Sequence, residues 1–185
     1  MDAAGKPHGV LLRKMVKEDL PKVIRWNRDP ELDKYMDGDY PRDLSEAEHL
    51  FWAERRHPGI QKFIIEAGGI SIGDMEMVHI KWPAKEAEIR IRIGEKEYWN
   101  MGYGTTAVDI LLEKAFREMG LEHIYLRVYD FNLRAIRCYE KCGFRKMGIL
   151  RRSRPSARQK AWKNIVLMSV NKAVWSKRRR SGAQF

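Results

Sequence analysis

A change of hydrophobic period in the middle of the chain constrains its fold most strongly. The segment E-A-E-I-R-I-R-I-G (86–94) alternates isoleucine with charged residues, which is the two-residue period of a strand with one buried face. From 105 to 119, apolar residues recur at helical spacing instead. Gly102 and Gly104 stand between the two patterns. We therefore expect a strand that passes through a glycine bend into a helix packed on the same sheet.

The rest of the chain predicts a mixed α+β fold with a mostly antiparallel sheet and one right-handed crossover through the 105–119 helix. Gly68-Gly69 predicts a hairpin, and Ser45 with Glu48 is the capping-box pattern of a helix start. The acidic segment 31–43 is expected to be a loop with short helical pieces. The expected strands are 10–15, 62–67, 70–79, 86–94, 123–129, 144–150 and 164–170, and the expected helices are 18–28, 45–57, 105–119 and 132–143.

Charge divides the chain into two unequal parts. The 185 residues carry a net charge of +11, but the 41 residues from Arg145 onward hold 13 Lys and Arg and no acid. The first 144 residues therefore hold 23 basic and 25 acidic residues, a net charge of −2. We expect a flexible leader at 1–9, one domain at 10–172 and a basic, disordered tail at 173–185.

Composition argues against secreted and membrane-bound classes. No apolar run approaches the roughly 20 residues that cross a bilayer, and the first residues lack a signal peptide's apolar core. Cys138 and Cys142, four residues apart, are too few for a disulfide framework, and no second pair of residues has metal-ligand spacing. We therefore expect a cytoplasmic protein with reduced thiols, no metal and no membrane contact.

The glycine bend is the first candidate for chemistry. Backbone N–H groups and the positive end of a helix converge where glycines join a strand to a helix, and both favour a bound pyrophosphate. A single G-x-G is often only a turn, so this motif alone leaves both interpretations open. It is not a P-loop, because no Lys-Ser/Thr pair follows the glycines, and the third glycine of a dinucleotide fingerprint is missing.

Two motifs together resemble the GNAT superfamily of acetyl-CoA-dependent N-acetyltransferases. Y-W-N-M-G-Y-G-T-T-A (98–107) is similar to the family's pyrophosphate loop, and N-L-R-A-I-R-C-Y-E-K-C-G-F (132–144) to its later Asn/Tyr helix. Trp99 departs from the family's Gln or Arg, yet Tyr98-Trp99 resembles the branch that acts on ribosomal-protein N-termini and polyamines. The resemblance implies a sheet splayed between its fourth and fifth strands, with helices on both faces, and acetyl-CoA as co-substrate.

The resemblance also implies which residues hold the co-substrate. Backbone N–H groups would bind the pyrophosphate, a strand would pair with the pantetheine arm, and an asparagine would contact the co-substrate beyond the splay. These residues are Met101, Gly102, Tyr103, Gly104, Thr105 and Thr106 for the pyrophosphate, Ile91, Arg92 and Ile93 for the pantetheine, and Asn132 for the last contact.

Tyr139 and Glu88 are the candidate catalytic residues. In the resembling family this tyrosine protonates the departing thiolate, and a thiol pKa of about 8.5 and a phenol pKa of about 10 allow that transfer. Otherwise Tyr139 is an aromatic packing residue. Glu88 is either the general base for the amine, directly or through water, or a carboxylate paired with Arg90 or Arg127. His79 and His123 are further candidate bases, or residues at sheet edges.

The expected reaction is direct attack of a primary amine on acetyl-CoA within one ternary complex. Asp37 and Asp39, in the acidic segment, are the candidate residues that attract a cationic acceptor, or else they belong to a solvated loop. A polyamine-like small amine and a protein N-terminus remain alternative acceptors. The basic end is a solvated end, a source of positive charge for the phosphates of the co-substrate, or a contact for RNA or a ribosome. The resemblance leaves a homodimer as one expected oligomeric state. The alternative function is a non-catalytic nucleic-acid-binding or regulatory protein on the same scaffold.

Overall fold

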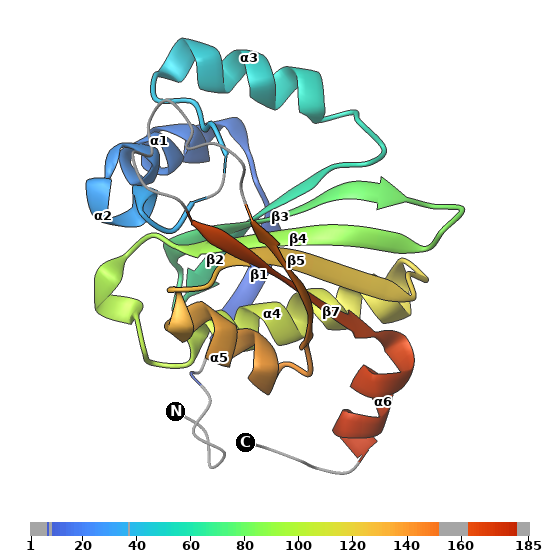
Figure 1. Cartoon of the computed structure of the whole chain (residues 1–185). Coiled ribbons are helices and arrows are strands. Elements are labelled where there is room, and N and C mark those ends of the chain that lie inside the picture. Colours follow the sequence, from blue (N-terminus) through green and yellow to red (C-terminus); the bar gives the residue numbers. More distant parts are fainter. Residues whose placement is uncertain (1–6, 8, 37, 152–162, 181–185) are drawn as a thin grey trace.

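The strands build one seven-stranded sheet in the order β1-β2-β3-β4-β5-β7-β6 (Figure 1). A computed structural model describes residues 7, 9–36, 38–151 and 163–180. The strands are β1 (Val10–Lys14), β2 (Gln61–Ala67), β3 (Ile70–Lys81), β4 (Glu86–Ile93), β5 (His123–Tyr129), β6 (Arg145–Arg151) and β7 (Asn164–Asn171). The helices are α1 (Leu20–Arg28), α2 (Pro30–Asp33), α3 (Leu44–Glu54), α4 (Tyr103–Glu113), α5 (Leu133–Lys141) and α6 (Lys172–Arg180), with shorter turns η1 (Lys17–Asp19), η2 (Lys96–Tyr98) and η3 (Lys114–Glu118).

Helices cover both faces of this sheet. Figure 1 shows α1, α2 and α3 on one side and α4 and α5 on the other. The main apolar core lies between the sheet and the α4–η3 segment, and it includes Ile89 of β4, Leu111 of α4 and Phe116 of η3. A smaller apolar cluster holds α1 against α3 through Ile24 and Phe51. The isoleucine face of β4 therefore points to α4, as its alternation predicted, and its charged face points to α1.

Neighbouring strands run antiparallel except in one place. β4 and β5 run parallel, and only Glu86–Glu88 and His123–Tyr125 pair. β7 lies between β5 and β6, antiparallel to both. The predicted mixed fold, mostly antiparallel and splayed between the fourth and fifth strands, is confirmed.

Two local predictions differ from the structure. Helix α3 begins at Leu44 because Asp43, rather than Ser45, accepts the hydrogen bond from the Glu46 amide, at 2.9 Å. Residues 173–180, expected within a disordered tail, belong to helix α6. The leader residues 1–6 and 8 and the last five residues lie outside the described part of the chain.

Helix α6 is ordered because it packs against α4 and η3. Trp175 is 2% exposed and its ring centroid lies 5.4 Å from that of Phe116. Arg178 pairs with Asp109 at 3.0 Å and Arg179 with Glu113 at 2.8 Å. The charge of this segment alone predicted a solvated end. Burial of the Trp175 indole stabilises the helix in spite of that charge. Among the described residues, no helix is long and apolar enough to cross a membrane.

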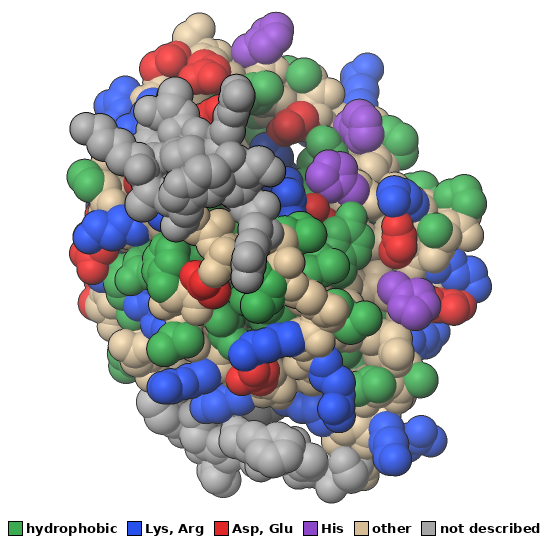
Figure 2. Space-filling view, in the orientation of Figure 1, with side chains coloured by type: hydrophobic (Ala, Val, Ile, Leu, Met, Phe, Trp, Pro, Cys, Tyr) green, Lys and Arg blue, Asp and Glu red, His purple; other side chains and the backbone are tan. Residues whose placement is uncertain are grey.

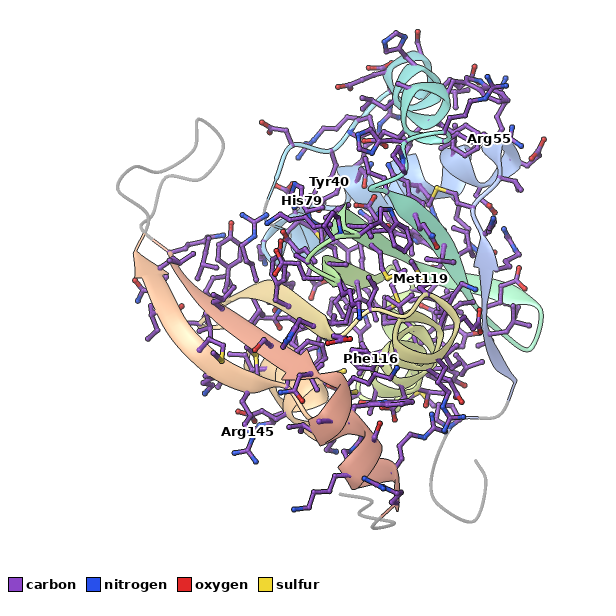
Figure 3. All side chains as sticks on the ribbon, turned by 90° about the vertical axis from the view of Figure 1, so that its right-hand side faces the viewer. Tyr40, Arg55, His79, Phe116, Met119 and Arg145 are labelled. Carbon is purple, nitrogen blue, oxygen red and sulfur yellow. The ribbon has the colours of Figure 1, made fainter. Side chains whose placement is uncertain are left out.

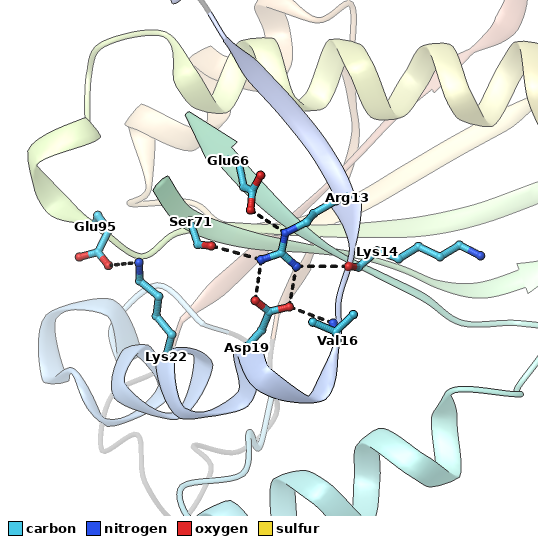
Figure 4. Close-up of polar contacts among 8 residues, drawn as sticks. All are labelled: Arg13, Lys14, Val16, Asp19, Lys22, Glu66, Ser71 and Glu95. Carbon is cyan, nitrogen blue, oxygen red and sulfur yellow. Dashed lines mark hydrogen bonds and ion pairs between the residues drawn. The ribbon is translucent and has the colours of Figure 1, made fainter. Parts of the chain in front are cut away.

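A polar network fastens the first helices to the sheet edge (Figure 4). Arg13 of β1 donates two hydrogen bonds to the Asp19 carboxylate, at 2.6 and 2.7 Å, and one to Glu66 of β2 at 2.6 Å. The Val16 amide donates to the same aspartate at 2.9 Å. Burial opposes ionisation, but the hydrogen bonds from Arg13 and Val16 outweigh it and lower the pKa of Asp19.

Replacing Asp19 by Asn should weaken the fold in a pH-dependent way. We expect Asp19→Asn to lower the free energy of unfolding by about 1–3 kcal/mol at pH 7 in urea titrations. Because the native pKa is lowered, the carboxylate stabilises the fold above its unfolded pKa of about 3.9, and the difference shrinks as pH falls below that value. Asp33→Asn, which removes an exposed pair with Arg42, should cost less than about 1 kcal/mol. A pH-independent difference would contradict this account.

Candidate active site

A cavity opens where β4 and β5 separate. Beyond the pair Glu88–Tyr125 the two strands no longer pair, and a cavity of about 400 Å³ lies between their ends. Its walls come from β4, the start of α4, the end of β5, α5 and the segment after α2. Of the predicted site residues, ten line it: Glu88, Ile91, Arg92, Ile93, Gly102, Tyr103, Gly104, Thr105, Asn132 and Tyr139.

Three predicted residues lie outside this lining. Met101 and Thr106 lie beside the cavity lining rather than in it, and the Thr106 amide already donates to the Gly102 carbonyl at 3.0 Å. Asp39 is exposed and lies outside the lining. Asp37 lies outside the described residues. The structure therefore brings together the strand, the glycine bend, Asn132 and both catalytic candidates, but not Asp39.

The glycine bend places the first residues of α4 at the cavity. Gly102 has a φ of +84° and precedes the first residue of α4, a left-handed conformation that glycine adopts without a Cβ clash. The first N–H groups of a helix have no partner within it and carry the positive end of its dipole. The N–H groups of Tyr103, Gly104 and Thr105 fall in this class, so this end of the cavity favours an anion.

Trp99, which differs from the family motif, stacks against a cation of α5. The Trp99 indole donates to the Ile93 carbonyl at 2.8 Å, which fixes its ring beside the bend. The Arg134 guanidinium lies 3.6 Å from that ring's centroid. Sequence reasoning missed this cation and two others in the lining, Arg137 and Lys141. Their spacing of three and four residues along α5 was the available signal.

Positive charge continues along the surface next to this wall. Figure 2 shows Lys and Arg side chains gathered on the lower part of the molecule, where Figure 1 has α5 and α6. Burial lowers the pKa of Arg134, but an arginine stays charged at neutral pH. The wall formed by α5 therefore suits a ligand that carries phosphates.

Tyr139 lies on the buried face of α5 and borders the cavity. The side chain is 7% exposed, and its ring packs against Phe144 at a centroid distance of 5.9 Å. Burial raises the pKa of Tyr139 well above the ordinary phenol value. Its hydroxyl is therefore protonated at neutral pH and can donate to a group within the cavity.

Glu88 is held by side chains from three strands. Its side chain is 4% exposed, Arg127 of β5 donates to Oε1 at 3.0 Å, and Arg90 approaches the same oxygen at 3.4 Å. Oε2 lies 3.1 Å from Nδ1 of His79 on β3. Burial opposes its charge, but Arg127 and Arg90 outweigh this and lower the pKa of Glu88. The expected pairing with Arg90 and Arg127 is present, and the carboxylate is ionised at neutral pH.

The charged face of β4 is closed by α1 beside the cavity. Arg92 is 5% exposed and donates to Asp74 at 2.7 Å and to the Asn27 side chain at 2.5 Å. Trp26 lies over the same guanidinium, and a Cβ added at Gly94 would approach that indole to 2.3 Å. The Arg92 side chain therefore links β4 to α1. The predicted ligand contact at this position concerns the backbone of β4.

Two thiols stand behind the glycine bend. Thr105 Oγ1 donates to Cys138 Sγ at 3.4 Å, and Cys142 Sγ approaches the Thr105 carbonyl at 3.5 Å. Cys138 lines the cavity, whereas Cys142 is fully buried. The hydrogen bond from Cys142 lowers the pKa of Cys138, and the hydroxyl of Thr105 adds to that effect.

Comparisons with known proteins agree with this geometry. The family described as Acetyltransferase (GNAT) domain matches residues 10–145. The chain is 29% identical over 143 residues to a spermidine N(1)-acetyltransferase of Escherichia coli (strain K12), covering 77% of this chain and 76% of the relative. The corresponding enzyme of Vibrio cholerae serotype O1 is 28% identical over 140 residues, covering 75% and 80%.

The fold is shared with a solved structure. The crystal structure of spermidine N-acetyltransferase from Vibrio cholerae, in complex with CoA and spermine, matches with a TM-score of 0.82. The match covers 90% of this chain and 98% of that one, at 23% sequence identity. At this level of identity the likeness shows the fold.

Labelling of Cys138 should report what occupies the cavity. We expect iodoacetamide to modify Cys138 before Cys142, because only Cys138 borders the cavity and its thiolate is favoured. Coenzyme A at ten times its dissociation constant should slow this reaction about ten-fold, since only the free protein reacts. Peptide mass spectrometry measures both rates, and Cys138→Ser is the control for site assignment. Labelling at the same rate with and without coenzyme A would contradict a site in this cavity.

Proposed function

The chain belongs to the GNAT acetyltransferase family, and on that premise we propose that it transfers the acetyl group of acetyl-CoA to a primary amine of a polyamine in the cavity between β4 and β5. One observation carries the proposal. The glycine bend, the unpaired edge of β4 and Tyr139 all face one cavity. Acetyl transfer from acetyl-CoA needs a site that binds phosphate, a channel for the extended pantetheine arm and a proton donor. The glycine bend, the edge of β4 and Tyr139 are suited to these three tasks in that order.

The residues of the cavity fit acetyl-CoA. The first N–H groups of α4 suit the pyrophosphate, and Arg134, Arg137 and Lys141 can neutralise phosphate charge. Beyond Glu88 the edge of β4 has no β5 partner, so its backbone can bond an extended pantetheine arm. The Asn132 side chain accepts from the Ala135 amide at 3.2 Å, so its Oδ1 caps α5 and its amide N–H₂ is the group suited to a ligand.

Tyr139 is the proposed general acid. The amine nitrogen bonds to the acetyl carbon, the carbon–sulfur bond breaks, and the departing thiolate takes the phenolic proton. The phenolate then recovers a proton from the nitrogen, which becomes a neutral amide. Burial keeps Tyr139 protonated before the reaction, and the same dry surroundings raise the basicity of a thiolate formed beside it.

Glu88 is the proposed acceptor of the first proton. A lysine-like amine is almost wholly protonated at neutral pH, so it must lose a proton before it can attack. Glu88 lines the cavity as an ionised carboxylate and can take that proton directly or through water. Its lowered pKa makes it a weak base that passes a proton on rather than storing it.

The choice of a polyamine rests on the relatives and on the acidic segment. Several of its carboxylates serve the fold: Asp29 accepts from the amides that start α2, Asp33 pairs with Arg42, and Asp43 caps α3. Asp39 is exposed, and its negative charge, with that of Asp37, is proposed to attract a cationic acceptor. RNA or ribosome contact, a homodimer and a cytoplasmic location stay predictions.

A panel of acceptors tests the proposal. We expect CoA release, followed with a thiol reagent against a blank without amine, to be faster with spermidine or spermine than with N-terminal peptides. Asp39→Asn should raise KM for spermidine about five-fold, the effect of about 1 kcal/mol of charge attraction. Glu118→Gln, at the far end of η3, is the control and should leave KM unchanged. Turnover of peptides alone would assign a protein N-terminus as acceptor, and no release with any amine would refute the proposal.

Removal of the Tyr139 hydroxyl should slow the chemical step. Tyr139→Phe keeps the ring that packs on Phe144, so unfolding temperature and KM for acetyl-CoA should stay close to wild type. We expect kcat to fall about 100-fold or more, the usual value of a positioned acid. An unchanged kcat would show that Tyr139 is a packing residue.

A further inference from the structure

We propose that His79 passes the proton taken up by Glu88 to solvent, which gives the acetyl-transfer site a proton exit on the α1–α3 side of the sheet. The inference rests on the proposed function. Acetylation of a protonated amine releases one net proton, and the candidate proton acceptor is a carboxylate that is 4% exposed. That proton needs a route out before the next turnover.

The two carboxylate oxygens of Glu88 have different partners. Oε1 faces the guanidinium groups of Arg127 and Arg90, which hold the carboxylate in place and cannot take up a proton. Oε2 faces Nδ1 of His79 at 3.1 Å. The His79 side chain is 57% exposed, so this imidazole joins the buried carboxylate to bulk water.

A distortion of β3 creates this contact. The pairing of β3 with β4 shifts its register between Val78, which lies opposite Glu88, and Lys81. His79 sits within the shift with a φ of +51°, a left-handed conformation rare for a residue with a side chain. Bulges of this kind redirect side chains and are common next to active sites. The distortion begins beside Glu88, the residue at which the pairing of β4 with β5 ends. The strained backbone of His79 and the cavity therefore lie at the same level of the sheet.

The position of His79 suits an exit rather than direct contact with the thioester. Figure 3 shows His79 and Tyr40 on the side of the sheet that faces α3, and Phe116 and Met119 on the opposite side. His79 is absent from the cavity lining, whereas Glu88 is part of it. Imidazole is the side chain that exchanges protons most readily near neutral pH. His79 is thus a positioning and relay residue that acts through Glu88.

The other charged groups around the pair do not offer the same route. Arg90 and Arg127 carry guanidinium groups, which have no acceptor site for a further proton. Tyr125 of β5 lies opposite Glu88, and burial together with the charge of Glu88 raises the pKa of Tyr125. Lys81, two residues beyond His79, pairs with Glu86 at 2.8 Å. Among these neighbours, His79 alone is an imidazole in contact with Glu88.

Substitution of His79 by asparagine separates proton transfer to solvent from support of the Glu88 side chain. His79→Asn keeps a side-chain N–H near the position of Nδ1, and asparagine tolerates the left-handed backbone, so Glu88 can stay held. It removes the second ring nitrogen that exchanges with water. We expect kcat for spermidine to fall at least ten-fold while KM for acetyl-CoA and the unfolding temperature stay unchanged. Added imidazole, at constant pH and ionic strength, should restore kcat in proportion to its concentration.

His49→Gln is the matched control, because His49 is an exposed histidine on α3 and is absent from the cavity lining. It should match the wild type and gain nothing from imidazole. A His79→Asn variant with wild-type kcat, or one whose lowered kcat does not respond to imidazole, would overturn the relay. Either result, beside an active wild type, leaves the acetyltransferase proposal standing. Inactivity of the wild type with every amine would refute the proposed function itself.

Discussion

The separation of β4 from β5 after three paired residues is the constraint on which the site depends. Backbone groups of a sheet seek partners, and an interruption inside a sheet is costly unless something else bonds them. Packed residues on both sides hold β4 and β5 apart. Trp99 bonds the Ile93 carbonyl on one side, and α5 supplies Tyr139 and Asn132 on the other. The gap is thus the place where we propose that an extended ligand binds.

The opposite faces of β4 show how one strand serves two purposes. Its isoleucines enter the main core against α4, so the glycine bend has a fixed position relative to the sheet. Its charged side chains meet α1 and the neighbouring strands in hydrogen-bonded pairs such as Arg92–Asp74. Buried charges without such partners would be strongly destabilising. The same pairing that satisfies this face also orients Glu88 toward the cavity.

Sequence periodicity predicted most of the fold, because alternation and helical spacing are local signals. The strand 123–129 and the order of elements followed directly, and the two motifs located the cavity wall. Signals that depend on tertiary contact were missed. Trp175 orders a helix whose charge suggested disorder, and Arg134 reaches Trp99 from another element. The left-handed backbone of His79 had no signal in a β-rich segment.

The position of β7 between β5 and β6 has a consequence for how the protein is made. Chains fold as they leave the ribosome, with N-terminal parts emerging first. The edge of β5 stays uncovered until residues 164–171 emerge, since β7 is its antiparallel partner. A nascent chain cut short before that point exposes an apolar strand edge, the kind of surface that promotes aggregation. The sheet therefore cannot close until residues 164–171 have been made.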